Sequence, residues 1–207
     1  LRTRRQRQMC IRDRYLPYAN DDENALKEQY KEIWNGLISK VLSSEKKTTI
    51  LWDYHADNLM WLPEREGVKS VGILDFQDAV IGNVSYDVLS LIEDARRDVK
   101  NSLANDLKDY FLSLNPYINQ NEFNTIYNIL AANRNCKILG VFLRLAIRDN
   151  KLNYLKYVPR VWDHLLRDLQ HPTLKSLKEW FDIAIPSKMR DINNLNIPES
   201  IIEAKIG

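Results

Sequence analysis

The 207-residue sequence is poor in the residues that build disulfide-rich or loop-dominated proteins. It contains only two cysteines, six glycines and seven prolines. Two cysteines cannot form a disulfide scaffold, so the sequence favours a reducing, cytoplasmic compartment. No apolar run approaches the length that crosses a bilayer. With 30 Lys and Arg against 28 Asp and Glu, neither sign of charge dominates, which argues against a nucleic-acid or membrane partner.

The small excess of positive charge is concentrated at the N-terminus. Residues 1–14 hold six Arg and one Asp, and they show no helical or strand period that would bury a face. Such a run could be a basic arm that binds nucleic acid or lipid. However, residues 4–14 resemble the translation of a transposase adapter used in sequencing libraries. We therefore expect residues 1–14 to be non-natural and disordered, and a gene truncated at its 5′ end.

The hydrophobic pattern predicts one helix, a small group of strands and then a block of helices. Apolar residues at 3.6-residue spacing predict a helix over about 20–41. Residues rich in β-branched and aromatic side chains predict strands over 48–54, 59–62 and 71–76. Further helices are expected over 86–97, 101–114, 121–149, 151–170 and 172–185, followed by a loose tail over 186–207. This order indicates an α+β fold, mostly helical with a small β-hairpin and strand cluster.

Polar side chains occupy the loops next to the predicted strands. Asp53 and Asn58 share one loop, and Asp75 lies at the end of the third strand. Taken alone, these residues could be strand-end caps and turn residues. Phosphoryl transfer, however, needs a carboxylate that orients the attacking hydroxyl and oxygen ligands that hold Mg²⁺ against the nucleotide phosphates. Together with the hairpin between them, the three residues predict phosphoryl transfer that depends on ATP and Mg²⁺.

The residues around these positions resemble a known superfamily. The segments 53–65 (DYHADNLMWLPER), 72–79 (GILDFQDA) and 86–99 (YDVLSLIEDARRDV) resemble the aminoglycoside phosphotransferase/choline kinase superfamily. Within it, the chain is most similar to bacterial kinases that phosphorylate the anomeric hydroxyl of N-acetylmuramate and N-acetylglucosamine in cell-wall recycling. The resemblance covers about residues 15–185. It implies the helix-rich C-terminal lobe of a protein-kinase-like fold.

The resemblance implies a role for each matching position. Asp53 matches the catalytic-loop Asp, and Asn58 and Asp75 match the two Mg²⁺ ligands that hold the ATP phosphates. Asp87 matches an Asp at the head of a helix, which braces the catalytic loop by accepting backbone N–H bonds.

Three further residues near the site have supporting or structural interpretations. His55 matches a structural histidine that hydrogen-bonds to the loop backbone. Asp78 matches a second acidic position after the metal-binding Asp, and Asp57 is expected to be a solvated loop residue. The sequence departs from the family just before Asp53, where a basic residue is common but this chain has Leu51 and Trp52.

The glycines point to a part of the kinase that this sequence does not contain. All six are isolated, so no glycine-rich loop is present to cradle phosphates. Lys46 and Lys47 lie in a predicted polar loop and not on a strand suited to ATP binding. We therefore expect the sequence to be a C-terminal lobe whose partner is the missing N-terminal lobe of the same chain, and to be inactive alone.

A basic stripe on the long predicted helix has two interpretations. It consists of Arg134, Lys137, Arg144 and Arg148, which fall within one quadrant of the helix surface. The stripe could form ion pairs between helices, with an acidic group at Glu93, Asp94 and Asp98. Alternatively, Arg134 and Arg144 could bind the lactyl carboxylate of N-acetylmuramate through the forked guanidinium.

Other functions stay open from the sequence alone. The substrate could be an aminoglycoside, choline or a homoserine-like hydroxyl. The chain could also be a non-catalytic kinase-like binding module, although the intact set Asp53, Asn58 and Asp75 argues against that interpretation. The preferred prediction is a kinase that binds a small-molecule sugar and a nucleotide.

Overall fold

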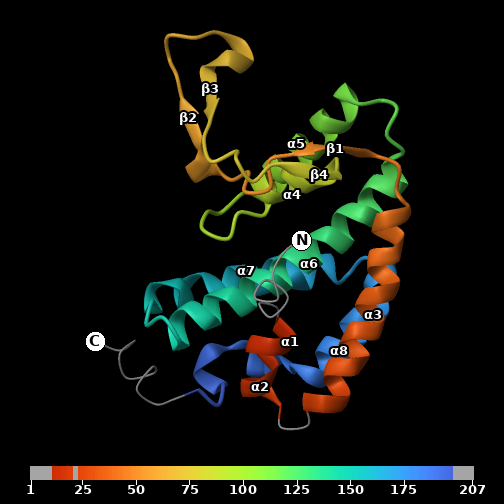
Figure 1. Cartoon of the computed structure of the whole chain (residues 1–207), viewed down its shortest axis with the longest axis vertical. Helices are drawn as coiled ribbons and strands as arrows, with labels where there is room; N and C mark the ends of the chain where they lie inside the picture. Colours follow the sequence, from red (N-terminus) through yellow and green to blue (C-terminus); the bar gives the residue numbers. More distant parts are fainter. Residues whose placement is uncertain (1–10, 21–22, 198–207) are drawn as a thin grey trace. The chain divides into compact units, whose positions relative to one another are not determined.

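The computed structural model describes residues 11–20 and 23–197, and it divides into two compact units (Figure 1). The helical unit contains the described residues up to Ser39 and those from Ala132 onward. The sheet unit contains residues 40–131. Helices α3 (Glu23–Ser43) and α6 (Gln120–Ile147) each contribute residues to both units.

The helical unit is built around buried aromatic side chains. Besides parts of α3 and α6, it contains α1 (Ile11–Arg14), α2 (Leu16–Ala19), η4 (Leu152–Tyr157), α7 (Val158–Asp168), η5 (Pro172–Leu174), α8 (Lys175–Ala184), η6 (Ser187–Arg190) and η7 (Ile192–Asn194). Trp162 meets Tyr15 and Phe181 edge to face, with ring centroids 5.3 and 5.8 Å apart. Edge-to-face pairs add to the stabilisation that apolar burial already provides.

Hydrogen bonds satisfy the polar tips of these aromatic side chains. The Tyr15 hydroxyl accepts from Trp162 Nε1 at 3.2 Å and lies 2.9 Å from the Met189 carbonyl, to which it donates. Trp180 Nε1 donates to the Leu26 carbonyl at 2.9 Å. Burial raises the pKa of Tyr15, which therefore stays a protonated donor. The core of this unit is thus both apolar and specifically connected.

The two ends of the described chain are more ordered than the sequence predicts. Ile11–Arg14 forms a helical turn and Ile11 is fully buried, so the expected disorder of residues 1–14 is wrong for 11–14. Residues 1–10 lie outside the described part. Within the expected loose tail, η6 and η7 form, and Ile192 and Leu195 are buried. Burial of these few apolar side chains outweighs the weak local pattern.

The sheet unit contains two separate two-stranded antiparallel sheets. Strand β1 (Lys47–Ile50) pairs with β4 (Val80–Asn83), and β2 (Leu59–Trp61) pairs with β3 (Val71–Ile73). The β2–β3 hairpin projects away from the β1–β4 pair (Figure 1), and η3 (Gly67–Ser70) lies at its tip. The short turn η2 (Ala56–Asn58) comes immediately before β2. Two helices complete the unit: α4 (Ser85–Ile92) and α5 (Asn101–Leu114).

A small apolar cluster holds the helices of the sheet unit together. Leu89 of α4 packs with Ile118, Phe123, Tyr127 and Ala131. In the β1–β4 pair, a Cβ atom at Gly82 would overlap the side chain of Ile50. The Ile50 side chain thus occupies the space that a side chain at position 82 would need.

The predicted α+β class is confirmed in coarse terms, because the described residues are mostly helical and carry small antiparallel sheets. Helix α5 has the predicted bounds 101–114. The strand predicted over 48–54 ends at Ile50, strand β4 was not predicted, and the helix predicted over 86–97 ends at Ile92. Among the described residues, none of the helices is long and apolar enough to cross a membrane.

Candidate active site

The loop 51–58 begins where strand β1 ends, and a carboxylate holds its start. The backbone N–H of Leu51 donates to Asp87 Oδ2 at 2.8 Å, and that of Trp52 donates to Asp87 Oδ1 at 3.3 Å. Asp87 lies in the first turn of α4. This is the geometry expected of the bracing Asp, and it explains why β1 stops at Ile50: the next two N–H groups bond to a side chain instead of a strand.

Trp52 adds an aromatic contact to this brace. Its φ of 74° places it in the left-handed region, which non-glycine residues seldom adopt. The indole ring stacks on Tyr86, with centroids 4.8 Å apart and planes 10° from parallel. Because Tyr86 and Asp87 are neighbours in α4, one helical turn holds both the ring and the backbone of the residue before Asp53.

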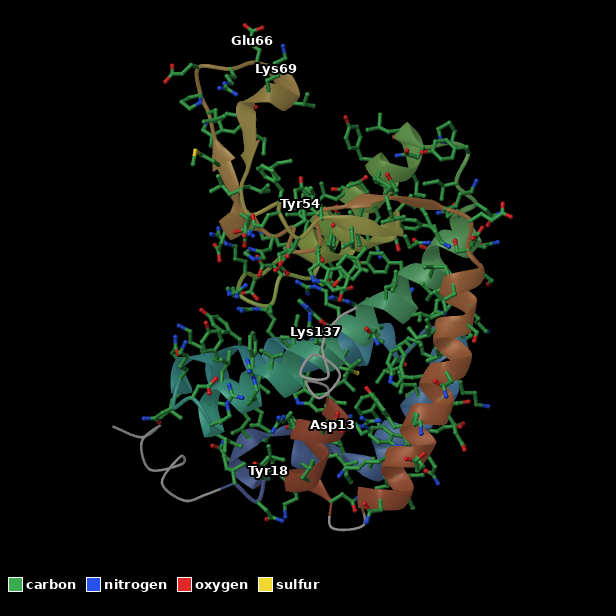
Figure 2. The ribbon with its side chains drawn as sticks, in the orientation of Figure 1. Asp13, Tyr18, Tyr54, Glu66, Lys69 and Lys137 are labelled. Atoms are coloured by element: carbon green, nitrogen blue, oxygen red, sulfur yellow. The ribbon has the colours of Figure 1, made fainter. Side chains whose placement is uncertain are left out.

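Partial burial shifts the pKa of two side chains near the start of the loop 51–58. Burial raises the pKa of Asp87, and the two N–H groups from Leu51 and Trp52 oppose that rise. Burial and the Asp87 carboxylate together raise the pKa of Tyr54. Both side chains line a cavity of about 670 Å³ within the sheet unit. Figure 2 shows Tyr54 beside the β1–β4 pair, with Glu66 and Lys69 at the tip of the hairpin.

Asp53 and Asn58 are joined directly. Asn58 Nδ2 donates to the backbone carbonyl of Asp53 at 2.9 Å, which closes the loop 51–58. The backbone N–H of Asn58 donates to the His55 carbonyl at 2.9 Å, as the turn η2 requires. The Asp53 side chain is exposed. With its amide nitrogen engaged, Asn58 has its oxygen available as an acceptor or metal ligand.

Asp75 lies at the same end of the β2–β3 hairpin as Asn58. Leu59 pairs with Ile73, and the N–H of Leu74 donates to the Asn58 carbonyl at 2.9 Å. Asp75 follows at a φ of 56°, a left-handed conformation that is costly for a non-glycine residue and typical of functional sites. Gln77 donates a hydrogen bond to Asp75 Oδ1. The sequence did not suggest a role for Gln77.

The three remaining polar residues of the loops differ in their surroundings. Asp57, expected to be solvated, forms an ion pair with Arg97, with 2.6 Å between Oδ1 and Nη2. The Arg97 hydrogen bond lowers the pKa of Asp57, and the same bond raises that of Arg97. His55 Nδ1 is buried without a partner among the described residues, so this nitrogen does not make the expected bond to the loop backbone. Asp78 is exposed between β3 and β4.

Two of the three acidic residues after α4, Glu93 and Asp94, are buried and so are not part of a solvated surface. Glu93 accepts from the Tyr127 hydroxyl at 3.0 Å, and Asp94 Oδ1 accepts from the backbone N–H of Arg96 at 2.8 Å. Glu93 and Asp94 are both at most 2% exposed, whereas Asp98 is exposed. A helical pattern cannot reveal this difference, because α4 ends at Ile92 and the following residues turn.

Arg134 and Arg144 lie on the part of α6 that belongs to the helical unit. Both side chains are partly buried, and the Arg144 Nε atom is buried without a hydrogen-bond partner among the described residues. Their proposed contact with a substrate carboxylate stays a prediction.

The loop 51–58 carries the exposed Asp53 carboxylate and the Asn58 amide, and Asp75 follows strand β3. The Asn58 carbonyl accepts from the N–H of Leu74, the residue before Asp75, and the Asn58 side chain donates to the backbone of Asp53, whose carboxylate is exposed. Amide and carboxylate oxygens are the donors that a hard cation such as Mg²⁺ prefers. The donor set therefore fits the metal that the sequence predicts.

Comparison with known proteins defines the class. Residues 1–118 match the model of the phosphotransferase enzyme family, and this match covers more than half of the chain. The chain belongs to this family.

The chain is also similar to individual proteins whose names are more specific than that of the family. The chain is 39% identical over 171 residues to the N-acetylmuramate/N-acetylglucosamine kinase of Caulobacter vibrioides, covering 82% of this chain and 46% of the relative. It is 29% identical over 163 residues to the kinase of the same name from Pseudomonas putida, covering 75% and 46%. The protein of that name from Neisseria meningitidis is 30% identical over 146 residues, covering 66% and 42%. The chain thus spans about half the length of the curated relatives it matches.

Proposed function

We propose that this chain carries the catalytic loop of a kinase that transfers a phosphoryl group from ATP to the anomeric hydroxyl of N-acetylmuramate or N-acetylglucosamine. The observation that supports it is the loop 51–58, in which the Asn58 side chain is bonded to the Asp53 backbone and the Asn58 carbonyl accepts from the N–H of Leu74, next to Asp75. The printed names of the relatives support the substrate class.

In the proposed mechanism each residue has one task. Asp53 orients the sugar hydroxyl and accepts its proton, because its carboxylate is exposed, whereas that of Asp57 is paired with Arg97. Asn58, through its amide oxygen, and Asp75, through a carboxylate, would hold Mg²⁺. When bound, Mg²⁺ would neutralise charge that develops on the transferred phosphoryl group. Asp87 and Trp52 hold the start of the loop so that these groups keep their positions.

The proposal also requires a nucleotide-binding part that these 207 residues do not supply. All six glycines are isolated in the sequence, and the curated relatives are about twice as long as the matched region. We expect the chain alone to show no turnover and a longer chain with an N-terminal lobe to be active. Turnover by the 207-residue chain alone would refute this part of the proposal.

The test is a substrate panel on the longer kinase, with ATP and Mg²⁺. We expect phosphate on the anomeric carbon of N-acetylmuramate or N-acetylglucosamine, detected by ³¹P NMR, and none on an aminoglycoside, choline or homoserine. Asp53→Asn should lower kcat by roughly 10²–10⁴-fold, the usual contribution of a general base, with nucleotide binding retained. Asp75→Ala should instead weaken Mg-nucleotide binding. Near-normal turnover in either variant would count against the role proposed for that residue.

The same assay tests whether the basic stripe on α6 binds the substrate. If Arg134 or Arg144 binds the lactyl carboxylate, replacement of either residue by Gln should lower activity on N-acetylmuramate more than on N-acetylglucosamine. An unchanged ratio of the two activities would remove these residues from the proposed substrate site.

A further inference from the structure

A single ion pair joins the turn that carries Asn58 to the segment after α4. Arg97 Nη2 lies 2.6 Å from Asp57 Oδ1, although the two residues are 40 positions apart in the sequence. Asp57 is the central residue of η2 (Ala56–Asn58), so it directly precedes Asn58. Any rotation of this turn would move the Asn58 side chain, because a 3₁₀ turn this short has no other residues to absorb the change.

The backbone that presents Arg97 is itself well defined. Asp94 is 1% exposed, and its Oδ1 accepts from the N–H of Arg96, which closes a tight turn directly before Arg97. Just before this turn, Glu93 is anchored by the Tyr127 hydroxyl inside the unit. Arg97 therefore extends from a fixed point, even though its own side chain is exposed.

Two contacts, one from α4 and one from the segment after it, thus hold the loop 51–58 at its two ends. At the start of α4, Asp87 accepts the N–H groups of Leu51 and Trp52. Just after the end of α4, Arg97 binds Asp57. The second contact adjoins the proposed metal ligand Asn58, whose Nδ2 is already committed to the Asp53 carbonyl.

We propose that Arg97 is a positioning residue: by holding Asp57 it fixes the turn η2, and thereby the direction in which Asn58 presents its oxygen to a divalent cation. This inference rests on the proposed function, which makes Asn58 a metal ligand. Neighbours that orient a metal ligand commonly change metal affinity by 10–100-fold when they are removed. An exposed ion pair, by contrast, contributes little to global stability.

The test is Mn²⁺ binding to the 207-residue chain, followed by electron paramagnetic resonance of the free ion. Arg97→Gln is expected to weaken Mn²⁺ binding by about tenfold. Arg96→Gln is the matched control, because it removes the same charge from the adjacent exposed residue. Removing a positive charge would by itself tighten binding of a cation. Weaker binding in Arg97→Gln would therefore report lost positioning and not lost charge.

Two further measurements separate positioning from a general structural role. Arg97→Lys keeps a cation that can reach Asp57 and should recover most of the affinity, and the urea midpoint should be the same in all variants. The amide of Asn58 donates to the His55 carbonyl, and the amide of Leu74 donates to the Asn58 carbonyl. Both amides should exchange with solvent faster in Arg97→Gln than in Arg96→Gln.

The outcomes distinguish this inference from the proposed function. If the unmodified chain binds Mn²⁺ and Asn58→Ala abolishes binding, but Arg97→Gln binds as tightly as the unmodified chain, the positioning role is wrong and the proposed metal site stands. If the unmodified chain binds no Mn²⁺, or Asn58→Ala binds it equally well, the proposed metal site fails and the positioning role fails with it.

Discussion

The core of the helical unit and the loops of the sheet unit are stabilised mainly by different interactions. The core of the helical unit is apolar and closed, with Phe181 and Leu165 fully buried. In the sheet unit, the segment 59–81 exposes large apolar side chains, including Trp61 at 69% and Ile81 at 71%. Its loops are instead fixed by polar contacts, such as those of Asp87 with Leu51 and Trp52. Apolar burial is insensitive to direction, whereas hydrogen bonds fix direction.

Apolar and polar side chains should therefore matter in different parts of the molecule. Removing apolar volume should damage the helical unit and leave the loops of the sheet unit almost unaffected. Removing one polar contact should disturb the loops of the sheet unit and leave the helical unit almost unaffected. The reason is that a single carboxylate fixes the backbone of residues near Asp53. Catalytic groups are commonly carried by loops that a more rigid framework positions.

The largest expected effect comes from truncating the helical core. Phe181→Ala removes a fully buried ring that contacts Trp162 and Trp180 edge to face, and it should lower the free energy of unfolding by about 3–5 kcal/mol. Trp61→Ala removes a larger but exposed ring from the β2–β3 hairpin and should change that free energy by no more than about 0.5 kcal/mol. Urea denaturation of the chain measures both. Similar losses for the two variants would break the contrast between the units.

An intermediate effect is expected from removing the brace. Asp87→Ala leaves the N–H groups of Leu51 and Trp52 without their acceptor, which should cost about 1–3 kcal/mol. The larger change should be local: the amides of these two residues should exchange with solvent much faster, as followed by hydrogen exchange. Asp87→Asn keeps one acceptor oxygen and should fall between Asp87→Ala and the unmodified chain. Unchanged protection at both amides would show that the carboxylate does not hold the loop.

Asp87 also makes stability depend on pH. Because burial raises its pKa in the folded state, the folded state binds the proton more tightly than the unfolded state does. This contribution is fully present below the ordinary pKa of Asp and is lost as pH rises through the raised pKa. Asp87→Asn should abolish that decline, which a series of urea midpoints above pH 4 would detect. A decline of the same size in the variant would assign it to another group.

The smallest expected effect lies in the helical unit at His171. Its Nδ1 accepts from the backbone N–H of Thr173 at 3.3 Å and caps η5. Burial lowers the pKa of this imidazole, so its contribution is present above the ordinary His pKa and is lost as pH falls through the lowered one. His171→Asn keeps a capping acceptor that does not titrate. The variant should lose less stability than the unmodified chain between about pH 7 and pH 5, where His titrates.

Local pattern predicted some elements well and others poorly. The bounds of α5 follow from a helical pattern between Lys100 and Pro116, where nothing else competes. The strand predicted over 48–54 ends early, because the N–H groups of Leu51 and Trp52 bond to Asp87 36 and 35 residues away. Pattern also missed strand β4, whose exposed residues Val80 and Ile81 come just before the glycine that accommodates Ile50. Contacts between distant segments decide such boundaries, and periodicity does not contain them.

The candidate site shows the same division. Asp53, Asn58 and Asp75 were predicted from residue type and position beside the strands, and Asp87 from the resemblance to the kinase superfamily. The structure brings Asn58 into contact with the Asp53 backbone. The ion pair of Asp57 with Arg97 and the stacking of Trp52 on Tyr86 were not predicted. Both contacts join residues that are far apart in the sequence, beyond the reach of a motif.

The amino-acid sequence was sufficient to predict which carboxylates and amides lie beside short strands, and its segments around these residues indicated the family. The tertiary structure alone decided how these groups are held. Asp87 and Arg97 act on the loop 51–58 only because folding brings α4 and the segment after it against this loop. Hydrogen bonds and ion pairs act over a few ångströms, so the groups that orient a loop are set by proximity in space and not by order along the chain.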